Sequence, residues 1–318
     1  MKALVTGAAG FIGSHLSAAL ADEGADVVGL DCFTDYYPRA VKERNLAPLQ
    51  SRRNFAFVEA TLQTADLGRL LAGVTHVFHL AAQAGVRKSW GRDFAAYVSN
   101  NIESTQRLLE TVKDLPIDKF VYASSSSVYG DAVPIPMRED AVLQPVSPYG
   151  VTKLAAEHLC SLYHSSYGVP AVSLRYFTVY GPRQRPDMGF YRFLRAAHLG
   201  EPIPVYGDGE QTRDFTFVSD AVAATVAAGS RGCPGGVYNI GGGSRVSVNQ
   251  VLAVIQKIVG RPVPLLREPA QKGDMRDTFA DTARARTELG FSPSKSLESG
   301  LAAESEWLAG ELFAASKP

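Results

Sequence analysis

Two residues four positions apart, Tyr149 and Lys153, form a pair that could act as a base. In the helix that the surrounding pattern predicts, this spacing places both side chains on one face. A free tyrosine has a pKa of about 10, so only about one molecule in a thousand is a phenolate at pH 7. A lysine ammonium one turn away stabilises the phenolate, which can then remove a proton from a sugar or alcohol hydroxyl. The same spacing is common on surface helices, so a second signal is needed.

Four consecutive serines, at positions 124–127, follow an apolar run that predicts a strand over residues 119–123. The carboxyl ends of parallel strands are where an α/β sheet presents side chains to a ligand. The hydroxyls of Ser125, Ser126 and Ser127 could therefore bind a substrate hydroxyl and orient it toward the base. The alternative is a polar turn without a role in chemistry.

The N-terminal segment predicts a dinucleotide-binding unit. A strand pattern over residues 3–5 leads into Gly7, Gly10 and Gly13, and then into a helical pattern and a second strand pattern that ends at Asp31. Glycines at this spacing let the backbone approach a pyrophosphate at the N-terminus of a helix. An aspartate at the end of the second strand would accept hydrogen bonds from ribose hydroxyls and repel a 2′-phosphate, so NAD is favoured over NADP. The alternative is a glycine-rich turn in an ordinary αβ protein.

Strand and helix patterns alternate through the first half of the chain and predict an α/β fold with a doubly wound parallel (Rossmann) sheet. The predicted strands cover residues 26–30, 55–59, 77–80, 119–123 and 172–177, and the predicted helices cover 14–22, 97–112, 147–167 and 248–259. After Gly181 prolines and glycines interrupt the alternation, which indicates a smaller α/β substrate-binding region. We expect an NAD-binding domain over 1–180 and a mainly substrate-binding domain over 181–318, with some segments returning to the first domain.

Composition excludes several classes of protein. Of the 318 residues 46% are hydrophobic, so the chain can bury a sizeable core. Its 32 basic and 32 acidic residues balance, which gives no reason to expect nucleic acid or an anionic membrane as a partner. No apolar run approaches the length of about 20 residues that a membrane span needs, and no signal peptide is visible. The three cysteines lie far apart without metal-ligand spacing, so we expect reduced thiols, no metal and a cytoplasmic location.

Together these motifs resemble those of the extended short-chain dehydrogenase/reductases, and within them the NAD-dependent nucleotide-sugar epimerases and dehydratases. Besides the glycine motif and the Tyr149/Lys153 pair, the resemblance includes His79-Leu80-Ala81-Ala82, the serines followed by Val128-Tyr129-Gly130, Arg175-Tyr176-Phe177, residues 206–215 and Ala280-Asp281. It therefore covers nearly the whole chain.

This resemblance implies roles for individual residues. Tyr149 would be the catalytic base, Ser125 the hydroxyl beside it, and Lys153 the residue that holds the nicotinamide ribose. The residues implied to bind NAD are Gly7, Gly10, Phe11, Ile12, Gly13, Asp31, Leu80, Ala81, Ala82, Tyr149 and Lys153. Arg213 would clamp the diphosphate, because guanidinium groups match phosphate oxygens. One departure is Thr61-Leu62, where relatives often place an aspartate and an aliphatic residue against adenine; this weakens one expected contact.

Positions 125 to 127 separate the reactions of this family. The 4,6-dehydratases resemble Thr-Asp-Glu there, and UDP-glucuronate decarboxylases carry a glutamate at the position of Ser127. Neither acid is present in this chain, so elimination has no evident general acid or base. Epimerisation needs only the base and the cofactor, and is therefore the reaction that the resemblance favours.

Other segments are most similar to UDP-glucuronate 4-epimerases. They are Asp35-Tyr36-Tyr37, residues 83–87, residues 175–188 and residues 271–274. Arg87 and Arg185 then become candidates to neutralise the carboxylate of the sugar, and Arg276 could supply a second phosphate contact. The substrate-binding residues that we expect are Arg87, Ser126, Ser127, Thr178, Arg185, Arg213, Asp274 and Arg276.

The expected reaction is the NAD-dependent 4-epimerisation of a UDP-sugar through a 4-keto intermediate, from UDP-glucuronate to UDP-galacturonate. Tyr149 would remove the proton of the C4 hydroxyl while hydride passes from C4 to NAD, and the ketone would turn before hydride returns to its other face. The alternatives are a UDP-glucose or UDP-N-acetylglucosamine 4-epimerase, then a UDP-glucuronate decarboxylase. A non-enzymatic NAD-sensing regulator would be expected to lose Tyr149 or Lys153. We also expect a homodimer, because relatives pair the two helices over 97–112 and 147–167.

Overall fold

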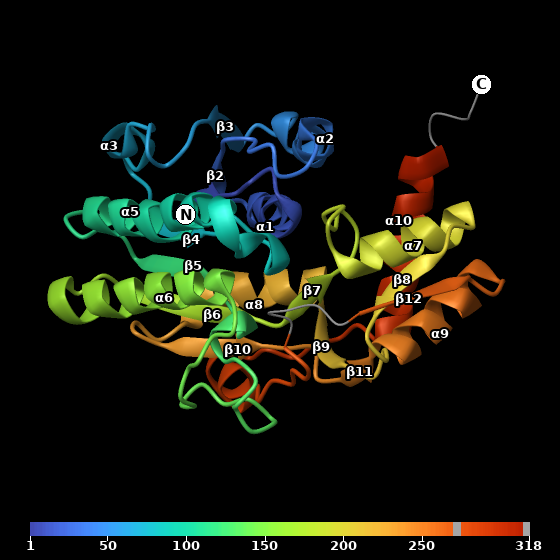
Figure 1. The fold of residues 1–318 in the computed structure, drawn as a ribbon. Helices are drawn as coiled ribbons and strands as arrows, with labels where there is room; N and C mark the ends of the chain where they lie inside the picture. The colour runs from blue at the N-terminus through green and yellow to red at the C-terminus, as the bar shows by residue number, and fades with distance from the viewer. Residues whose placement is uncertain (270–274, 314–318) are drawn as a thin grey trace.

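The computed structural model describes residues 1–269 and 275–313 and has a central parallel sheet between two layers of helices (Figure 1). The sheet has seven strands in the order β10-β6-β5-β4-β1-β2-β3. They are β1 (Lys2–Thr6), β2 (Asp26–Asp31), β3 (Phe55–Glu59), β4 (His76–His79), β5 (Lys119–Ser125), β6 (Ala171–Tyr176) and β10 (Val237–Ile240). This confirms the doubly wound sheet. Because β1 lies between β2 and β4, the direction of winding reverses there, and ligands of such sheets bind beyond the carboxyl ends at this point.

The helices bury both faces of the sheet. One face is covered by α1 (Phe11–Asp22), α2 (Arg39–Gln50) and α8 (Val218–Arg231), and the other by α3 (Leu67–Leu70), α5 (Ser104–Val112) and α6 (Pro148–Tyr167). Strand β5 shows how the sequence divides the core. Phe120 and Tyr122 pack in the cluster of α5 and α6, whereas Val121 packs in the cluster of α1 and α8, as the alternation of side chains along a strand requires.

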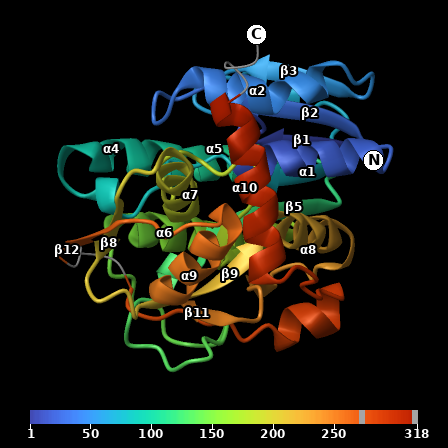
Figure 2. The same cartoon turned by 90° about the vertical axis from the view of Figure 1, so that its right-hand side faces the viewer.

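A smaller lobe lies beside the sheet, at the right of Figure 1. It contains β7 (Thr178–Tyr180), β8 (Ile203–Tyr206), β9 (Thr212–Phe217), β11 (Arg245–Ser247), β12 (Leu265–Glu268), α7 (Gly189–Leu199), α9 (Val248–Val259) and α10 (Leu297–Phe313). Helix α10 packs against α7 and α9 of the smaller lobe, and its C-terminal end reaches toward α2 (Figure 2), where Glu311 pairs with Arg44 at 2.7 Å. Although β10 lies far along the chain, it pairs with β6 in the main sheet. The division into domains at residue 180 stays a prediction.

Helix α6 has the start and end that its sequence predicts. The Ser147 side chain accepts a hydrogen bond from the Gly150 amide, Pro148 occupies the first turn, and Gly168 ends the helix with φ of 73°. Serine, proline and glycine suit these three positions because of their hydroxyl, fixed φ and tolerance of positive φ. Local chemistry thus sets both ends of the helix that carries Tyr149 and Lys153.

Two elements differ from the predicted pattern. Strand β5 continues through Ser124 and Ser125, which pair with Arg175 and Tyr176 of β6, so these serines end the strand rather than follow it. The predicted helix over 97–112 is divided into α4 (Phe94–Tyr97), a π-helical segment over 98–103 and α5. The π-helical segment carries the buried Asn101, a kind of irregularity that often marks a functional site.

Candidate active site

A cavity lies beyond the carboxyl ends of strands β1, β2, β4, β5 and β6. It is lined by every residue that the sequence predicts to bind NAD: Gly7, Gly10, Phe11, Ile12, Gly13, Asp31, Leu80, Ala81, Ala82, Tyr149 and Lys153. Ser124, Tyr176 and Arg185 also line it. The fold therefore gathers one set of residues from five strand ends, as expected for a ligand site at the carboxyl edge of a parallel sheet.

The glycine loop fits a pyrophosphate. A Cβ on Gly13 would lie 2.0 Å from the carbonyl oxygen of Gly7, so glycine is required for α1 to begin this close to β1. Gly10 is the N-cap of α1 and has no side chain to satisfy the first amides of the helix. A bound phosphate would satisfy those amides and benefit from the helix dipole. The loop is thus built to admit an anionic backbone rather than a side chain.

The ends of β1, β2 and β4 are joined by short polar contacts. Asp31 accepts hydrogen bonds from the amides of Ala9 at 3.1 Å and Phe33 at 2.9 Å, so its carboxylate is fixed beside the glycine loop. The Thr6 hydroxyl lies 2.8 Å from Nδ1 of His79 and accepts hydrogen bonds from the amides of Leu80 and Ala81. Burial lowers the pKa of His79 to about 3, so this imidazole is neutral and structural.

Tyr149 and Lys153 both face the cavity, but their side chains have different neighbours. Burial raises the pKa of the Tyr149 phenol, whereas a hydrogen bond with Ser125 and the charge of Arg185 lower it. Lys153 is only 3% exposed, and its ammonium lies 4.4 Å from the centre of the Tyr122 ring. Burial lowers the pKa of Lys153 to about 7. The Ser125 contact agrees with the sequence expectation, and the influence of Arg185 on the phenol could not be read from the spacing.

Arg185 forms a bidentate pair with Asp187 inside the same site. The Arg185 Nε and Nη2 atoms donate to the two Asp187 carboxylate oxygens at 2.9 and 3.0 Å. Tyr36 donates to the same carboxylate at 3.3 Å, which ties the pair to the loop between β2 and α2. The guanidinium therefore lines the same cavity as the candidate base, where it could meet an acidic group of a substrate.

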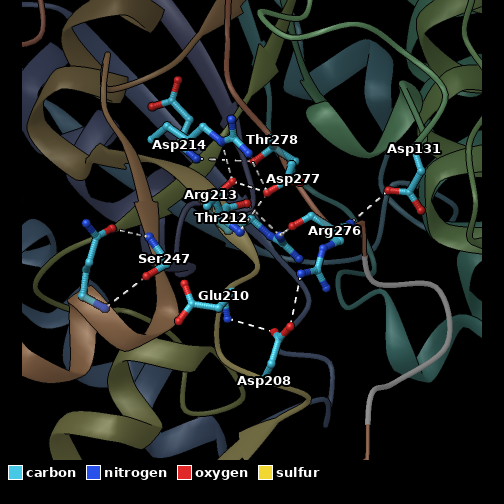
Figure 3. Close-up of polar contacts among 12 residues, drawn as sticks. Asp131, Asp208, Glu210, Thr212, Arg213, Asp214, Ser247, Arg276, Asp277 and Thr278 are labelled. Atoms are coloured by element: carbon cyan, nitrogen blue, oxygen red, sulfur yellow. Dashed lines mark hydrogen bonds and ion pairs between the residues drawn. The ribbon is translucent and has the colours of Figure 1, made fainter.

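The side chains of the other predicted arginines have partners near β8 and β9 of the smaller lobe. Arg213 donates to the carbonyl of Arg276 at 3.0 Å, and the Arg276 side chain contacts Asp208 at 3.2 Å (Figure 3). The Arg87 guanidinium lies 4.3 Å from the centre of the Tyr206 ring, at the end of β8. Arg87 itself belongs to the short helical turn Arg87–Ser89 that follows β4, and it reaches Tyr206 from there. Unlike Arg185, these three arginines are not part of the cavity lining. The predicted Asp274 and the motif over 271–274 lie outside the described residues.

The remaining predicted substrate residues lie near the ends of β5 and β6. Ser126 and Ser127 form the short turn after β5, and the Ser127 amide donates to the Ser125 hydroxyl at 3.1 Å. Thr178 begins β7, two residues after the end of β6. Because Ser125 pairs with Tyr176 across the sheet, these hydroxyls share one edge of it. They do not line the cavity of the predicted NAD residues.

Two buried polar residues at or next to the cavity were not predicted from the sequence. Lys42 lines the cavity, and its buried ammonium donates to the Thr34 carbonyl at 2.6 Å. Asn101 binds the backbone of Gln83 through both amide atoms and donates to Thr152 of α6 at 2.9 Å. Both residues lie on the buried faces of helices, so a polar side chain at an apolar position was the available signal.

Three further observations concern the described residues, 1–269 and 275–313. No three histidine, cysteine or acidic side chains gather there as a metal site would require. No helix in these ranges is both long and apolar enough to cross a membrane. Cys32, Cys160 and Cys233 are free thiols.

The fold and site define a dinucleotide-binding protein with a tyrosine–lysine pair at the end of the cavity. Residues 3–241 match the model of the NAD dependent epimerase/dehydratase family. The chain is 46% identical over 310 residues to the uncharacterised UDP-glucose epimerase YtcB of Bacillus subtilis, covering 97% of this chain and 98% of that protein. It is 38% identical over 311 residues to the UDP-glucuronate 4-epimerase of Thermodesulfobacterium geofontis, with coverage of 96% and 95%.

A solved structure is similar over almost the full length. The UDP-glucuronic acid 4-epimerase of Bacillus cereus, in complex with UDP-glucuronic acid and NAD, superimposes with a TM-score of 0.95 at 45% identity. The match covers 98% of this chain and 100% of that one. The chain belongs to the NAD dependent epimerase/dehydratase family.

Proposed function

We propose that this protein is an NAD-dependent 4-epimerase that interconverts UDP-glucuronate and UDP-galacturonate. The observation that carries the choice of substrate is Arg185, a cation that lines the same cavity as Tyr149. A guanidinium at that place can bind a carboxylate on the sugar through two parallel hydrogen bonds. The relatives named as UDP-glucuronate 4-epimerases support the same substrate.

The residues of the site can carry the proton steps. Bound NAD supplies a reversible acceptor for hydride at C4 of the sugar. Tyr149 takes the proton of the C4 hydroxyl and later returns it, while Ser125 orients that hydroxyl and stabilises the phenolate through its hydrogen bond. Lys153 holds the nicotinamide ribose and, when protonated, favours the phenolate of Tyr149.

The two ends of the substrate are assigned to different arginines. Arg213 and Arg276 meet on the smaller lobe, where they can clamp the diphosphate. Arg87, which follows β4, reaches Tyr206 of that lobe. Arg185 remains in the cavity with Tyr149. The sugar would then be anchored by its diphosphate on one side, with its carboxylate directed toward Arg185 on the other.

The function is tested by giving the NAD-loaded protein a panel of UDP-sugars and resolving the products by chromatography. We expect UDP-glucuronate to be converted to a mixture with UDP-galacturonate and almost no pentose. Preferential conversion of UDP-glucose or UDP-N-acetylglucosamine would favour a neutral-sugar epimerase, which the name of the Bacillus subtilis relative makes the second candidate. Mainly pentose products would identify a decarboxylase.

Thr178→Ala should make the enzyme release part of its product as a UDP-4-keto-pentose. The 4-keto form of UDP-glucuronate is a β-keto acid, and it loses carbon dioxide when its carboxylate aligns with the carbonyl π system. Thr178, at the start of β7, and Ser127 offer hydroxyls that can hold the carboxylate out of that alignment. A hydrogen bond to a charged group contributes about 1.5–3 kcal/mol, enough to change the product ratio by about tenfold or more.

Mass spectrometry of the reaction mixture measures that ratio directly. Thr64→Ala is the matched control, because its hydroxyl contacts Thr61 outside the sheet edge of Thr178. The idea fails if Thr178→Ala yields no more keto-pentose than this control.

A homodimer in solution is also expected, formed by the helices α5 and α6. The outer surface of this region exposes large apolar side chains: Phe94 37%, Val98 38%, Val151 47%, Leu162 55% and Tyr167 57%. Light scattering at micromolar concentration should give twice the chain mass, and Leu162→Glu should shift the protein toward the monomer. Leu199→Glu, at a 40% exposed position of α7, should leave the mass unchanged. A monomeric wild type would refute the pairing. A cytoplasmic location remains a prediction.

A further inference from the structure

Helix α6 presents a third ionisable residue on the face of the catalytic pair. Tyr149, Lys153 and Glu157 are spaced four residues apart, so they follow one another along one side of the helix. Glu157 is 3% exposed, a degree of burial that a carboxylate tolerates only when it is paired. No step of the proposed reaction uses it. Its position nevertheless places a buried carboxylate one turn beyond Lys153.

Both oxygens of Glu157 are occupied by other partners. Nη2 of Arg175 donates to Oε1 at 2.6 Å, and Nε lies 3.2 Å from each oxygen. The Ser124 hydroxyl donates to Oε2. Within the described part of the chain, no ion pair joins Glu157 to Lys153, whose ammonium lies over the Tyr122 ring instead. The Glu157 carboxylate therefore lies one helical turn from Lys153 and forms no ion pair with it.

The Arg175 guanidinium has further hydrogen-bond partners besides Glu157. Its Nη1 atom donates to the Tyr129 hydroxyl at 2.8 Å and to the Glu139 carbonyl at 3.1 Å. Tyr129 in turn donates to Asn239 of β10 at 2.7 Å. Arg175 thus connects β6, α6 and the segment after β5 to the last strand of the sheet, and the ion pair cannot turn toward the cavity without breaking these bonds.

We infer that Glu157 is a positioning residue for Lys153. The charge of Glu157 keeps the Lys153 ammonium protonated. Because Arg175 and Ser124 already bind the Glu157 carboxylate, this carboxylate does not form an ion pair with the ammonium. Lys153 then stays free to bind the ribose of NAD beside Tyr149. The role given to Lys153 rests on the proposed function. A carboxylate without Arg175 would pair directly with the ammonium, because an unpaired buried charge is costly.

The electrostatics around Lys153 agree with this geometry. Burial lowers the pKa of Lys153 to about 7, and the negative charge of Glu157 counteracts that effect. The ionisable groups that interact with the ammonium are Glu157 and Cys160 on α6, Tyr122 on β5 and His79 on β4. Burial raises the pKa of Tyr122 and Cys160 and lowers that of His79, so these three are neutral near pH 7. Glu157 supplies the negative charge, partly offset by Arg175.

Glu157→Gln tests the inference, because glutamine keeps the shape but lacks the charge. Its oxygen can still accept from Arg175, while its amide nitrogen can donate to the Ser124 hydroxyl. The pKa of Lys153 should fall, so the ammonium is lost at a lower pH. We expect the apparent pKa of the alkaline limb of the kcat–pH profile to fall by about one unit, which is the size of shift that the loss of one nearby charge causes. In protein stripped of NAD, calorimetry should show an NAD affinity several-fold weaker than wild type at pH 8 and similar to wild type at pH 6.

Two further variants keep the test decisive. Glu304→Gln changes another buried acid, on α10, whose contact is the Gly181 amide, and should leave the alkaline limb and the NAD affinity unchanged. If Glu157→Gln does not fold, Glu157→Gln combined with Arg175→Met removes the unpaired guanidinium as well and should show the same direction of shift. A folded variant with the wild-type limb and wild-type NAD affinity at pH 8 would make the ion pair purely structural and overturn the inference.

The proposed substrate can fail without affecting this result. NAD affinity of the stripped protein depends on Lys153 and its surroundings and not on which sugar is used. A wild type that epimerises only neutral UDP-sugars would refute the proposed function, while the pH-dependent loss of NAD affinity in Glu157→Gln would still support the role of Glu157.

Discussion

Tyr149→Phe is expected to reduce turnover by about three orders of magnitude, within the range that a positioned acid–base group supplies, with little effect on binding. Phenylalanine fills the same volume on α6 and leaves the glycine loop and the arginines in place. In the proposed reaction the phenol both accepts and returns the C4 proton, and it shares a hydrogen bond with Ser125. Removing an interaction made only along the reaction path lowers kcat and leaves ground-state binding intact.

Rapid kinetics and calorimetry separate these effects. NAD and UDP-sugar affinities of Tyr149→Phe should stay within a few-fold of wild type, while product formation nearly stops. Tyr163→Phe is the matched control, because it removes a phenol from the same helix whose partner is Glu110 rather than the cavity. Turnover near the wild-type level in Tyr149→Phe would rule out this residue as the base.

Arg185→Met should weaken the binding of UDP-glucuronate by about 100-fold and that of UDP-glucose far less. Methionine keeps an unbranched stem but removes the guanidinium, and each hydrogen bond to a charged group contributes about 1.5–3 kcal/mol. The substitution also leaves Asp187 without its cationic partner, so the substrate carboxylate would meet a negative charge. UDP-glucose lacks that carboxylate, and so avoids both penalties.

Affinities of both nucleotide sugars for the NAD-loaded protein, measured by calorimetry, decide between the two candidate arginines. Arg87→Met is the control, since Arg87 lies over Tyr206 in the smaller lobe. It should weaken both sugars equally if it serves the shared diphosphate. Selective loss of UDP-glucuronate in Arg87→Met, with little change in Arg185→Met, would transfer the carboxylate to Arg87.

The sequence by itself determined the elements whose chemistry is local. The glycine loop could be predicted because its glycines lie within a single turn, where a side chain on Gly13 would collide with Gly7. The starts of α6 and α9 follow from N-caps, namely Ser147 with Gly150 and Ser247 with Gln250, and their ends from Gly168 and Gly260 in the left-handed region. Such interactions depend on spacing along the chain and on side-chain type, both of which are visible in the sequence.

The sequence also predicted which residues gather at the cavity, though less directly. Parallel strands present their carboxyl ends at one edge, so residues after predicted strands were expected to meet there. The structure places all the predicted NAD residues along one cavity. Their individual roles stay predictions.

Only the tertiary structure decided which charges face one another. Arg185 and Arg87 were equivalent candidates in the sequence, and the fold places the first in the cavity and the second over Tyr206. The pairing of Glu157 with Arg175 and the return of β10 to the main sheet likewise join separate segments. Such contacts depend on how whole elements pack and on which rotamers that packing permits. Residue spacing does not encode this, so the electrostatic environment of Tyr149 and Lys153 emerges only once the chain is folded.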